Sequence, residues 1–414
     1  MERRQFLQAS AAAAAVPRTV LGANDRIQAG IIGTGSRFNT YLHLAFLKQT
    51  DCTIVAGCDV ARNRLDEFAT KVGGKVDTYA DYRRVLERKD IDAVVIATPD
   101  HWHSPMTVAA CEAGKDVYVE KPVSNTIPAA LKMVEATHRY KRVVQVGLQQ
   151  RSWPHFQECA KMVQDGLLGT VTHAVVQHRG GNEVKPEPPQ QPPPGLDWEM
   201  WQGPAPRRPY TPGRHRGWHA YYDYSGGYLT NWGVHHIDVV HWFLNADAKA
   251  PLLASASAQY VQLASPDPEQ VPSAFSVSWK YDKFVMSFTN AEMPNPEFDS
   301  WGAYFHGPRG SLLVNRPGYQ LQPSSRPGRP QGENRDEAAF NAKTFALKNW
   351  PAGEREAEIV HVRNWLDCIK SRQKPVCDMD TGFHSTLPTL LGLLAVRHER
   401  TYAWDTETKT AKAV

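Results

Sequence analysis

The sequence lacks long hydrophobic runs, a large excess of charge of one sign and cysteines at metal-binding spacing. Its 414 residues carry 47 basic and 43 acidic side chains, and a net charge of +4 gives no reason to propose nucleic acid or a membrane surface as a partner. The alanine-rich stretch near the N-terminus is too short and broken to span a bilayer. The six cysteines are scattered, which favours buried free thiols over a disulfide framework.

The chain is too long for one ordinary hydrophobic core, because typical domains hold about 100–200 residues. Hydrophobic residues make up 42% and charged residues 22%, a balance that supplies apolar material for two cores. Sixteen histidines and twelve tryptophans stand out. These residue types fill cores, and they also form carbohydrate-binding surfaces and proton-transfer sites. Their number alone therefore does not decide between a structural and a functional role.

The first 25 residues are predicted to be a leader. Residues 3–7 read Arg-Arg-Gln-Phe-Leu and precede an alanine-rich stretch over residues 11–15. This order resembles a twin-arginine signal, which is a receptor-read address for the export of folded proteins. We therefore expect a periplasmic or secreted destination, with a frayed N-terminal helix as the alternative.

An apolar run over residues 27–32 ends in a glycine turn that leads into a helical pattern. A strand, a glycine turn and a helix start form a pyrophosphate site, because backbone N–H groups at the helix N-terminus point at the anion. Phe38 replaces the third glycine of the G-x-G-x-x-G pattern, so the turn alone is a weak signal. The candidate cofactor-binding residues of this turn are Gly33, Thr34, Gly35, Ser36, Arg37 and Phe38.

A second predicted strand over residues 52–58 strengthens the nucleotide hypothesis, since Asp59 stands at its carboxyl end. A carboxylate there accepts hydrogen bonds from the adenosine ribose and repels a 2′-phosphate, which favours NAD over NADP. Arg62 keeps NADP open, because a nearby guanidinium serves a phosphate. An exposed arginine on the helix surface is the alternative.

Two further apolar runs, residues 92–97 and 116–119, flank another helical stretch. Strands that alternate with helices indicate an α/β fold with a doubly wound parallel sheet, here a Rossmann-type domain over residues 26–148. The loops at the carboxyl ends of such strands line the ligand crevice. These loops carry Thr98, Pro99 and His103 after the first run and Glu120 and Lys121 after the second.

This part of the chain resembles the glucose-fructose oxidoreductase and inositol dehydrogenase family (Gfo/Idh/MocA). The resemblance spans residues 26–405 and rests on the glycine turn, Asp59, residues 97–103, Glu120-Lys121-Pro122 and a segment from Gly226-Gly227 to Asp238. It implies an NAD(P)-dependent sugar oxidoreductase with Lys121 between nicotinamide and substrate. From the residues alone, a lysine facing the crevice donates to a substrate oxygen with a lowered pKa. A surface lysine paired with Glu120 is the alternative.

The segment from Gly226 to Trp242 is dense in histidine. Helical spacing places His235 and Asp238 on one face, and Asn231 is a good N-cap residue, which leaves His235 in the first helical turn. The positive helix end disfavours an imidazolium, so His235 is predicted to be a neutral general base. The family pattern often has an acidic residue where Asn231 stands, and asparagine orients a hydroxyl without sharing a proton. Asp238 is expected either to orient His235 or to cap and solvate the helix.

The same segment leaves a metal site open, but His236 and His241 point away from the face of His235, so no metal is predicted. Gln149 completes the predicted cofactor set. The predicted catalytic residues are Lys121, His235, Asn231 and Asp238. The residues predicted to bind the substrate are Lys121, Arg151, Trp218, Tyr222, Asn231 and His235.

Residues 149–414 are predicted to form a C-terminal α+β domain. Alternating segments such as residues 274–279 and 284–288 predict a large, mostly antiparallel sheet. In the resembled family such a sheet forms the subunit interface, which implies a homo-oligomer, a dimer or tetramer. The proline-rich residues 185–195 cannot join a sheet and are predicted to be a packed loop or an oligomer arm. Helical patterns over residues 359–369 and 387–398 should pack back on the body.

These patterns predict an exported NAD(P)-dependent oxidoreductase that acts on a sugar, polyol or glycoside hydroxyl, with a tightly bound, recycled nucleotide. One alternative is a redox-assisted glycoside-cleaving or epimerising enzyme, in which transient oxidation at sugar C3 acidifies the neighbouring C–H. Another is a nucleotide-binding sensor that has lost the chemistry, because Phe38 and Asn231 depart from the family pattern.

Overall fold

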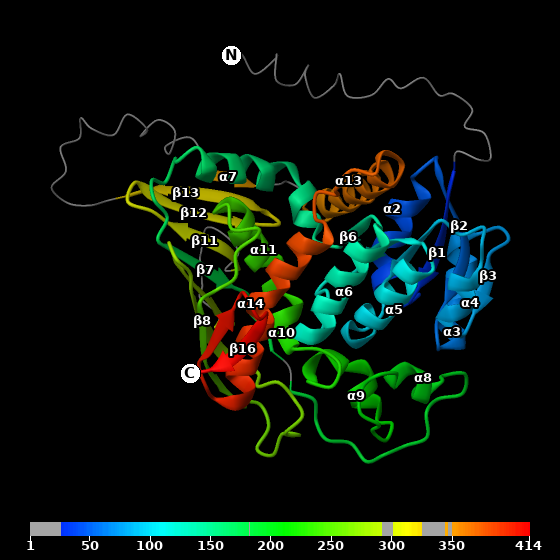
Figure 1. Cartoon of the computed structure of the whole chain (residues 1–414). Coiled ribbons are helices and arrows are strands. Elements are labelled where there is room, and N and C mark those ends of the chain that lie inside the picture. The colour runs from blue at the N-terminus through cyan, green and yellow to red at the C-terminus, as the bar shows by residue number, and fades with distance from the viewer. Residues whose placement is uncertain (1–25, 182, 292–300, 325–343, 347–349) are drawn as a thin grey trace.

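The computed structural model describes residues 26–181, 183–291, 301–324, 344–346 and 350–414 (Figure 1). The predicted leader over residues 1–25 lies outside the described residues. Within them, no helix combines the length and apolar character that a bilayer crossing requires. All six cysteines are free thiols.

The N-terminal part is a six-stranded parallel sheet in the order β3-β2-β1-β4-β5-β6. The central strands β4 and β5 are wholly buried, and apart from Asp116 and Tyr118 they are aliphatic, as expected of strands covered on both faces by helices. Its strands are β1 Ile27–Ile32, β2 Cys52–Cys58, β3 Asp77–Tyr79, β4 Ala93–Ile96, β5 Asp116–Val119 and β6 Val144–Val146. Its helices are the π-helical η2 Arg37–Leu42, α2 His43–Leu47, α3 Arg62–Val72, α4 Tyr82–Glu87, α5 Asp100–Glu112 and α6 Ile127–Tyr140.

This strand order is that of the Rossmann fold, and it reverses direction between β1 and β4. Ligands of such sheets bind outside the carboxyl ends of the strands at this reversal point. The fold therefore directs attention to the loops after β1, β2 and β4.

The C-terminal part is built on a ten-stranded sheet in the order β14-β13-β12-β11-β7-β10-β9-β8-β15-β16. Each neighbouring pair is antiparallel except β7 with β10, so the predicted α/β plus α+β fold class is confirmed. Its strands are β7 His173–Gln177, β8 Leu253–Gln259, β9 Ala274–Lys280, β10 Val285–Thr289, β11 Gly302–His306, β12 Gly310–Asn315, β13 Gly318–Pro323, β14 Thr344–Ala346, β15 Tyr402–Asp405 and β16 Thr410–Ala413.

Helices join the two sheets. Helices α11 (Gly233–Phe243) and α14 (Met379–His398) lie between them, and α13 (Trp350–Ser371) lies against the N-terminal part near α2 (Figure 1). Trp365 of α13 packs edge-on against Phe46 and Tyr118. The prediction that the C-terminal helices pack back on the body is confirmed. The remaining helices are η3 Gln149–Ser152, α7 Pro154–Gln164, α8 Trp198–Gln202, α9 Pro212–Arg216, η4 Trp218–Ala220 and α10 Gly227–Asn231.

One segment of the C-terminal part crosses over to the Rossmann sheet. We call residues 195–219 the insert; it holds α8, α9 and the start of η4, and it follows the proline-rich stretch. The Gly195 carbonyl accepts the backbone N–H of Arg62 at 2.9 Å, and the Asp197 N–H donates to the Val60 carbonyl at 3.0 Å. Trp201 adds a second anchor, since its carbonyl accepts the Trp102 indole N–H at 2.8 Å. The proline-rich stretch thus leads into a packed cover of the nucleotide-binding edge.

Candidate active site

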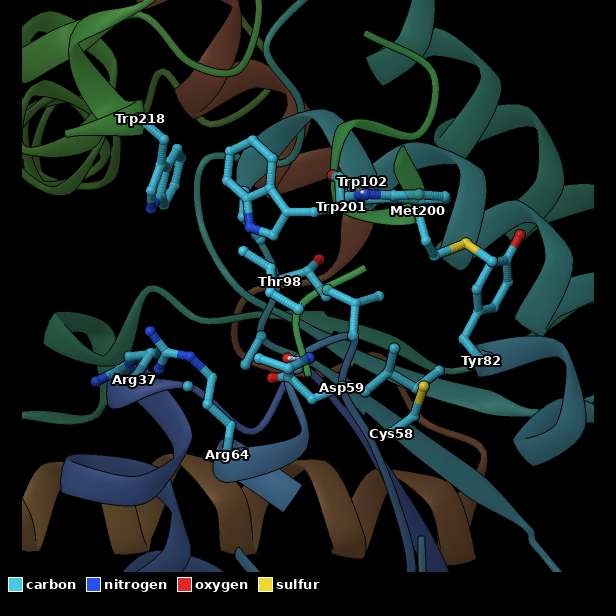
Figure 2. Close-up of a pocket in the computed structure, with 18 of the residues that line it drawn as sticks. Arg37, Cys58, Asp59, Arg64, Tyr82, Thr98, Trp102, Met200, Trp201 and Trp218 are labelled. Atoms are coloured by element: carbon cyan, nitrogen blue, oxygen red, sulfur yellow. Dashed lines mark hydrogen bonds between the residues drawn. The ribbon is translucent and has the colours of Figure 1, made fainter. Parts of the chain in front are cut away.

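A pocket of about 370 Å³ opens at the reversal point of the Rossmann sheet. The glycine turn after β1, the end of β2 and the end of β4 line one side, and the insert lines the other. Figure 2 shows Trp201, Met200 and Trp218 of the insert facing Asp59 and Arg64 across the pocket. Two separate stretches of the chain therefore enclose one ligand space.

The glycine turn forms a cradle that larger residues would fill. Gly33 has a φ of +89°, and a Cβ added there would come 2.6 Å from the Ala97 carbonyl oxygen of the neighbouring strand. A Cβ on Gly35 would lie 3.0 Å from Arg64 Nη1. Gly33, Gly35 and Ser36 line the pocket as predicted, and Thr34 is buried beneath them. The turn therefore leaves backbone space for a ligand.

Asp59 is fixed at the carboxyl end of β2 by its surroundings. Its carboxylate accepts the backbone N–H groups of Thr34 at 2.9 Å and Ala61 at 3.0 Å. Burial raises the pKa of Asp59. The two N–H bonds and the charge of Arg64 oppose this increase in pKa. The side chain is rigidly placed on the pocket wall, where a ribose hydroxyl acceptor is needed.

The predicted Arg62 lies outside the pocket lining, which contains Arg64 instead. The Arg62 side chain is 70% exposed and pairs with Asp66 one turn along α3, so it points away from the pocket. Arg64 lies two residues further around the helix and lines the pocket beside Asp59. Helical geometry turns neighbouring positions by about 100°, so a shift of two residues changes which side chain faces the ligand.

Phe38 is also not at the pocket. Its ring is fully buried in the core, 5.6 Å from that of Phe68, because η2 turns this position toward the helices. Arg37, the preceding residue, lines the pocket, and its guanidinium pairs with Glu120 and Glu358 at 2.7 Å each. Glu120 is therefore a buried partner of Arg37, and it does not line the pocket.

The loop after β4 holds the other predicted cofactor residues. Thr98 and Pro99 line the pocket, and the Thr98 hydroxyl is buried without a hydrogen-bond partner in the part of the chain that the structure describes. His103 lies behind them, with its ring nitrogens 2.9 Å from the Thr98 carbonyl and 2.7 Å from the Pro122 carbonyl. His103 thus ties the β4 loop to the β5 loop and positions both.

The pocket suits a dinucleotide. The glycine cradle admits a bulky anion, the Thr98 hydroxyl needs a partner, and two guanidiniums face the space without a carboxylate ion pair among the described residues. Those guanidiniums belong to Arg64 and Arg216. Positive charge and free backbone N–H groups are what a pyrophosphate requires.

Lys121 follows β5 and points toward the C-terminal part. Its ammonium group donates to the Asn231 side-chain oxygen at 2.5 Å and to the Asn231 carbonyl at 3.2 Å. Burial lowers the pKa of Lys121 to about 8, against the charges of Glu120 and Asp100. The surface-lysine alternative is thereby excluded, because Glu120 bonds to Arg37 instead.

His235 lies in the first turn of α11 and is 4% exposed. Burial and the nearby charges of Lys121 and Arg316 hold the pKa of His235 well below its usual value, so the ring is neutral. Burial, rather than the helix end, is the main cause. We expected Asn231 to be the N-cap of α11, but it is the last residue of α10. There its side-chain oxygen accepts a hydrogen bond from the Lys121 ammonium group.

Three predicted residues are structural. Arg151 is buried and donates to Asp238 at 2.8 Å and Asp247 at 2.6 Å, and it does not line the pocket. Asp238 also accepts the Ser385 hydroxyl at 2.7 Å, so it neither orients His235 nor solvates the helix. The Arg397 guanidinium lies over the Tyr222 ring, with its carbon 4.5 Å from the ring centre, and Tyr222 does not line the pocket. Side chains that pair off in the core are unavailable to a ligand.

Gln149 is buried in η3 and does not line the pocket, so its cofactor role is not supported. Trp218 does line the pocket, as the end of the insert. No three metal-binding side chains come together among the described residues, and His241 instead bonds to the Tyr281 hydroxyl at 2.7 Å.

The insert contributes pocket residues that the sequence analysis missed. His215, Arg216 and His219 line the pocket beside Trp201. The only signal for them was the density of tryptophan and histidine in this segment. No spacing rule links residues 195–219 to a strand end more than 100 residues earlier, so the contact required the structure.

The Rossmann sheet and its pocket define a protein of the dinucleotide-binding class. Residues 27–148 match the model of an oxidoreductase family with an NAD-binding Rossmann fold, and residues 154–362 match the C-terminal alpha/beta domain of the same family. The chain belongs to the Gfo/Idh/MocA family of oxidoreductases and carries its NAD-binding Rossmann domain.

Curated relatives of the chain include inositol dehydrogenases. Inositol 2-dehydrogenase 3 of Saccharopolyspora erythraea is 33% identical over 162 residues, which are 39% of this chain and 47% of the relative. Inositol 2-dehydrogenase of Salmonella typhimurium is 25% identical over 224 residues, 54% of this chain and 56% of the relative. The chain thus matches about half the length of these curated relatives.

Solved structures share the fold over nearly the whole chain. A levoglucosan dehydrogenase in complex with NADH and levoglucosan has a TM-score of 0.66 at 17% identity, covering 94% of this chain and 99% of that one. The WlbA dehydrogenase of Bordetella pertussis, in complex with NADH and UDP-GlcNAcA, has a TM-score of 0.64 at 16% identity, covering 95% and 99%. At these identities the likeness shows the fold.

Proposed function

We propose that the chain oxidises a hydroxyl group of a sugar, polyol or glycoside with NAD. The observation that carries this proposal is the placement of Lys121 and a neutral His235 together at the carboxyl edge of the Rossmann sheet. The names of the relatives support it, since inositol dehydrogenases act on a polyol and the levoglucosan dehydrogenase structure holds an anhydrosugar.

Each side chain has a defined task in this proposal. Lys121 donates a hydrogen bond to the substrate oxygen, and its charge stabilises the negative charge that develops there. His235 takes the hydroxyl proton, and Asn231 orients Lys121 through its side-chain oxygen. Bound NAD supplies the hydride acceptor. Gly33, Gly35, Asp59 and Arg64 are the residues that would hold it.

We further propose that the nucleotide stays bound between turnovers. The insert covers the pocket and is anchored to the Rossmann sheet by two backbone hydrogen bonds and by the Trp201 carbonyl. Release of the nucleotide requires these contacts to open. Retention also suits the proposed export through the leader over residues 1–25, because an exported enzyme has no access to cytoplasmic NAD.

We also propose a homo-oligomer that forms through the large sheet. Side chains of β9 alternate between buried and exposed, and the exposed ones are Ser276, Ser278 and Lys280. The adjacent β8 exposes Ser255 and Ser257 in the same way. The serines on these two strands leave room for a second sheet to pack against this face.

Transfer of hydride to the retained nucleotide tests the proposed function. Purified protein, with no nucleotide added, is mixed with levoglucosan, myo-inositol and methyl glucosides, and the near-ultraviolet absorbance of reduced nicotinamide is recorded. We expect at least one sugar to produce one reduced nucleotide per active site. Absorbance that rises and then returns, with loss of an aglycone, identifies the redox-neutral variant. Bound NAD that no sugar reduces would contradict the proposal.

A further inference from the structure

His219 occupies a position that the proposed chemistry does not use. It belongs to η4 at the end of the insert and lines the nucleotide pocket together with Thr98 and Trp218. It also lies close enough to Lys121 for the ammonium charge to lower its pKa. His219 therefore stands where the nucleotide pocket meets the catalytic lysine.

The His219 ring is held in place but keeps its hydrogen-bonding capacity. It stacks on the Trp218 indole with ring centres 3.6 Å apart and an interplanar angle of 24°. Among the described residues, neither ring nitrogen forms a hydrogen bond with the protein. Burial, followed by the charge of Lys121, lowers the pKa of His219 to about 3, so the ring is neutral. A neutral imidazole offers one donor and one acceptor to a ligand.

Charge around Lys121 is balanced. The two guanidiniums that act on it belong to Arg37, which pairs with Glu120 and Glu358, and to Arg316, which pairs with Glu354. Within the described ranges, each guanidinium beside Lys121 already pairs with a carboxylate, which reduces the positive charge available to a substrate carboxylate or phosphate, although Arg316 Nε has no hydrogen-bond partner there. Arg64 and Arg216, which do lack a carboxylate partner there, line the nucleotide pocket.

These observations point to one class of ligand. We propose that His219 hydrogen-bonds a hydroxyl group of an uncharged sugar or glycoside, next to the hydroxyl that Lys121 and His235 handle. This inference rests on the proposed oxidation of a sugar. The indole of Trp218, stacked on His219, lies at the pocket wall where it can contact a sugar C–H face (Figure 2). His219 is then a substrate-recognition residue carried by the same segment that covers the nucleotide.

The test compares His219→Ala with His219→Gln, which keeps a donor and an acceptor. With the uncharged sugar that reduces the bound nucleotide fastest, we expect His219→Ala to raise KM about tenfold with kcat within about threefold of wild type. His219→Gln should recover much of this loss. His138→Ala is the matched control, since His138 is an exposed histidine on α6.

Binding without turnover gives a second readout. Protein loaded with NADH cannot oxidise the sugar, so calorimetric titration with the same sugar reports recognition alone. We expect the dissociation constant of His219→Ala to rise about tenfold, with unchanged nucleotide content. D-glucuronate should bind the wild-type protein at least tenfold more weakly than the best uncharged probe.

Three results would overturn the inference. A fall of kcat by 100-fold or more at constant KM, unrescued by glutamine, would make His219 a proton-transfer residue. Unchanged KM and affinity in His219→Ala would remove it from the site. Tighter binding of D-glucuronate than of any uncharged sugar would refute the ligand class. If no sugar reduces the nucleotide bound to the wild-type protein, the proposed function itself fails. This result distinguishes failure of the proposed function from failure of the role given to His219.

Discussion

Lys121→Met is expected to abolish sugar oxidation and to stabilise the folded protein. The activity falls by roughly 10³-fold, because the donor to the substrate oxygen and its charge are lost together. The stability gain comes from the buried ammonium group. Lowering its pKa from 10.5 to about 8 corresponds to roughly 3 kcal/mol at neutral pH, which the lost bonds to Asn231 partly offset.

The pH dependence of this gain has a definite sign. The folded protein releases the Lys121 proton near pH 8, whereas the unfolded chain holds it up to about pH 10.5, so wild-type stability rises across this window. The difference in Tm between Lys121→Met and wild type should therefore be positive at pH 7 and shrink toward pH 10. Oxidation by the wild type should also decline above about pH 8, as Lys121 loses its charge.

Lys115→Met is the matched control for activity. Lys115 is another buried lysine of the Rossmann part, and its ammonium group donates to the carbonyls of Arg88 and Ile91 at 2.7 Å each, outside the pocket. Its loss should leave turnover per folded molecule unchanged. A Lys121→Met protein that keeps more than a tenth of wild-type turnover would remove Lys121 from the mechanism.

Gly33→Ala is expected to eliminate bound nucleotide. The residue has a φ of +89°, which costs an alanine about 1–2 kcal/mol, and its Cβ would meet the Ala97 carbonyl oxygen at 2.6 Å. Strands β1 and β4 must move apart to relieve this contact, and this deforms the turn that cradles the pyrophosphate. We expect nucleotide affinity to fall at least 100-fold and Tm to drop by several degrees.

Gly114→Ala separates the cost of a positive φ from the effect of the clash with the Ala97 carbonyl. Gly114 has a similar φ of +77°, but no atom lies within 4 Å of its Cβ position. The variant should lose about 1 kcal/mol of stability and keep its nucleotide. Equal nucleotide content in Gly33→Ala and wild-type protein, measured by acid release, would show that the glycine turn does not form the cofactor site.

The sequence predicted the Rossmann part well because its signals are local. A buried strand, a glycine turn and a carboxylate at the next strand end lie within about 30 residues, and each constrains the backbone by itself. The direction in which each side chain points was harder to predict from the sequence. Arg62 and Arg64 both follow Asp59 on α3, and only the rotation of the helix decides that Arg64 faces the pocket.

In the C-terminal part, predicted site residues lie away from the pocket for a different reason. Asp238 shares a sequence segment with His235, which made a catalytic partnership plausible, yet its carboxylate faces the core and binds Arg151. That pairing joins η3 to α11 across more than 80 residues, and no local pattern encodes it. The insert is missed for the same reason, since its tertiary contacts with the loop after β2, the start of α3 and α5 decide its role.

The nucleotide content of the purified protein is the decisive measurement for a retained NAD. Full-length protein is isolated with no nucleotide added, passed through gel filtration and denatured in acid, and the released compound is identified by mass and quantified against the protein. We expect close to one NAD or NADH per chain, held under the insert. Nucleotide-free protein, or protein that holds NADP, would contradict it.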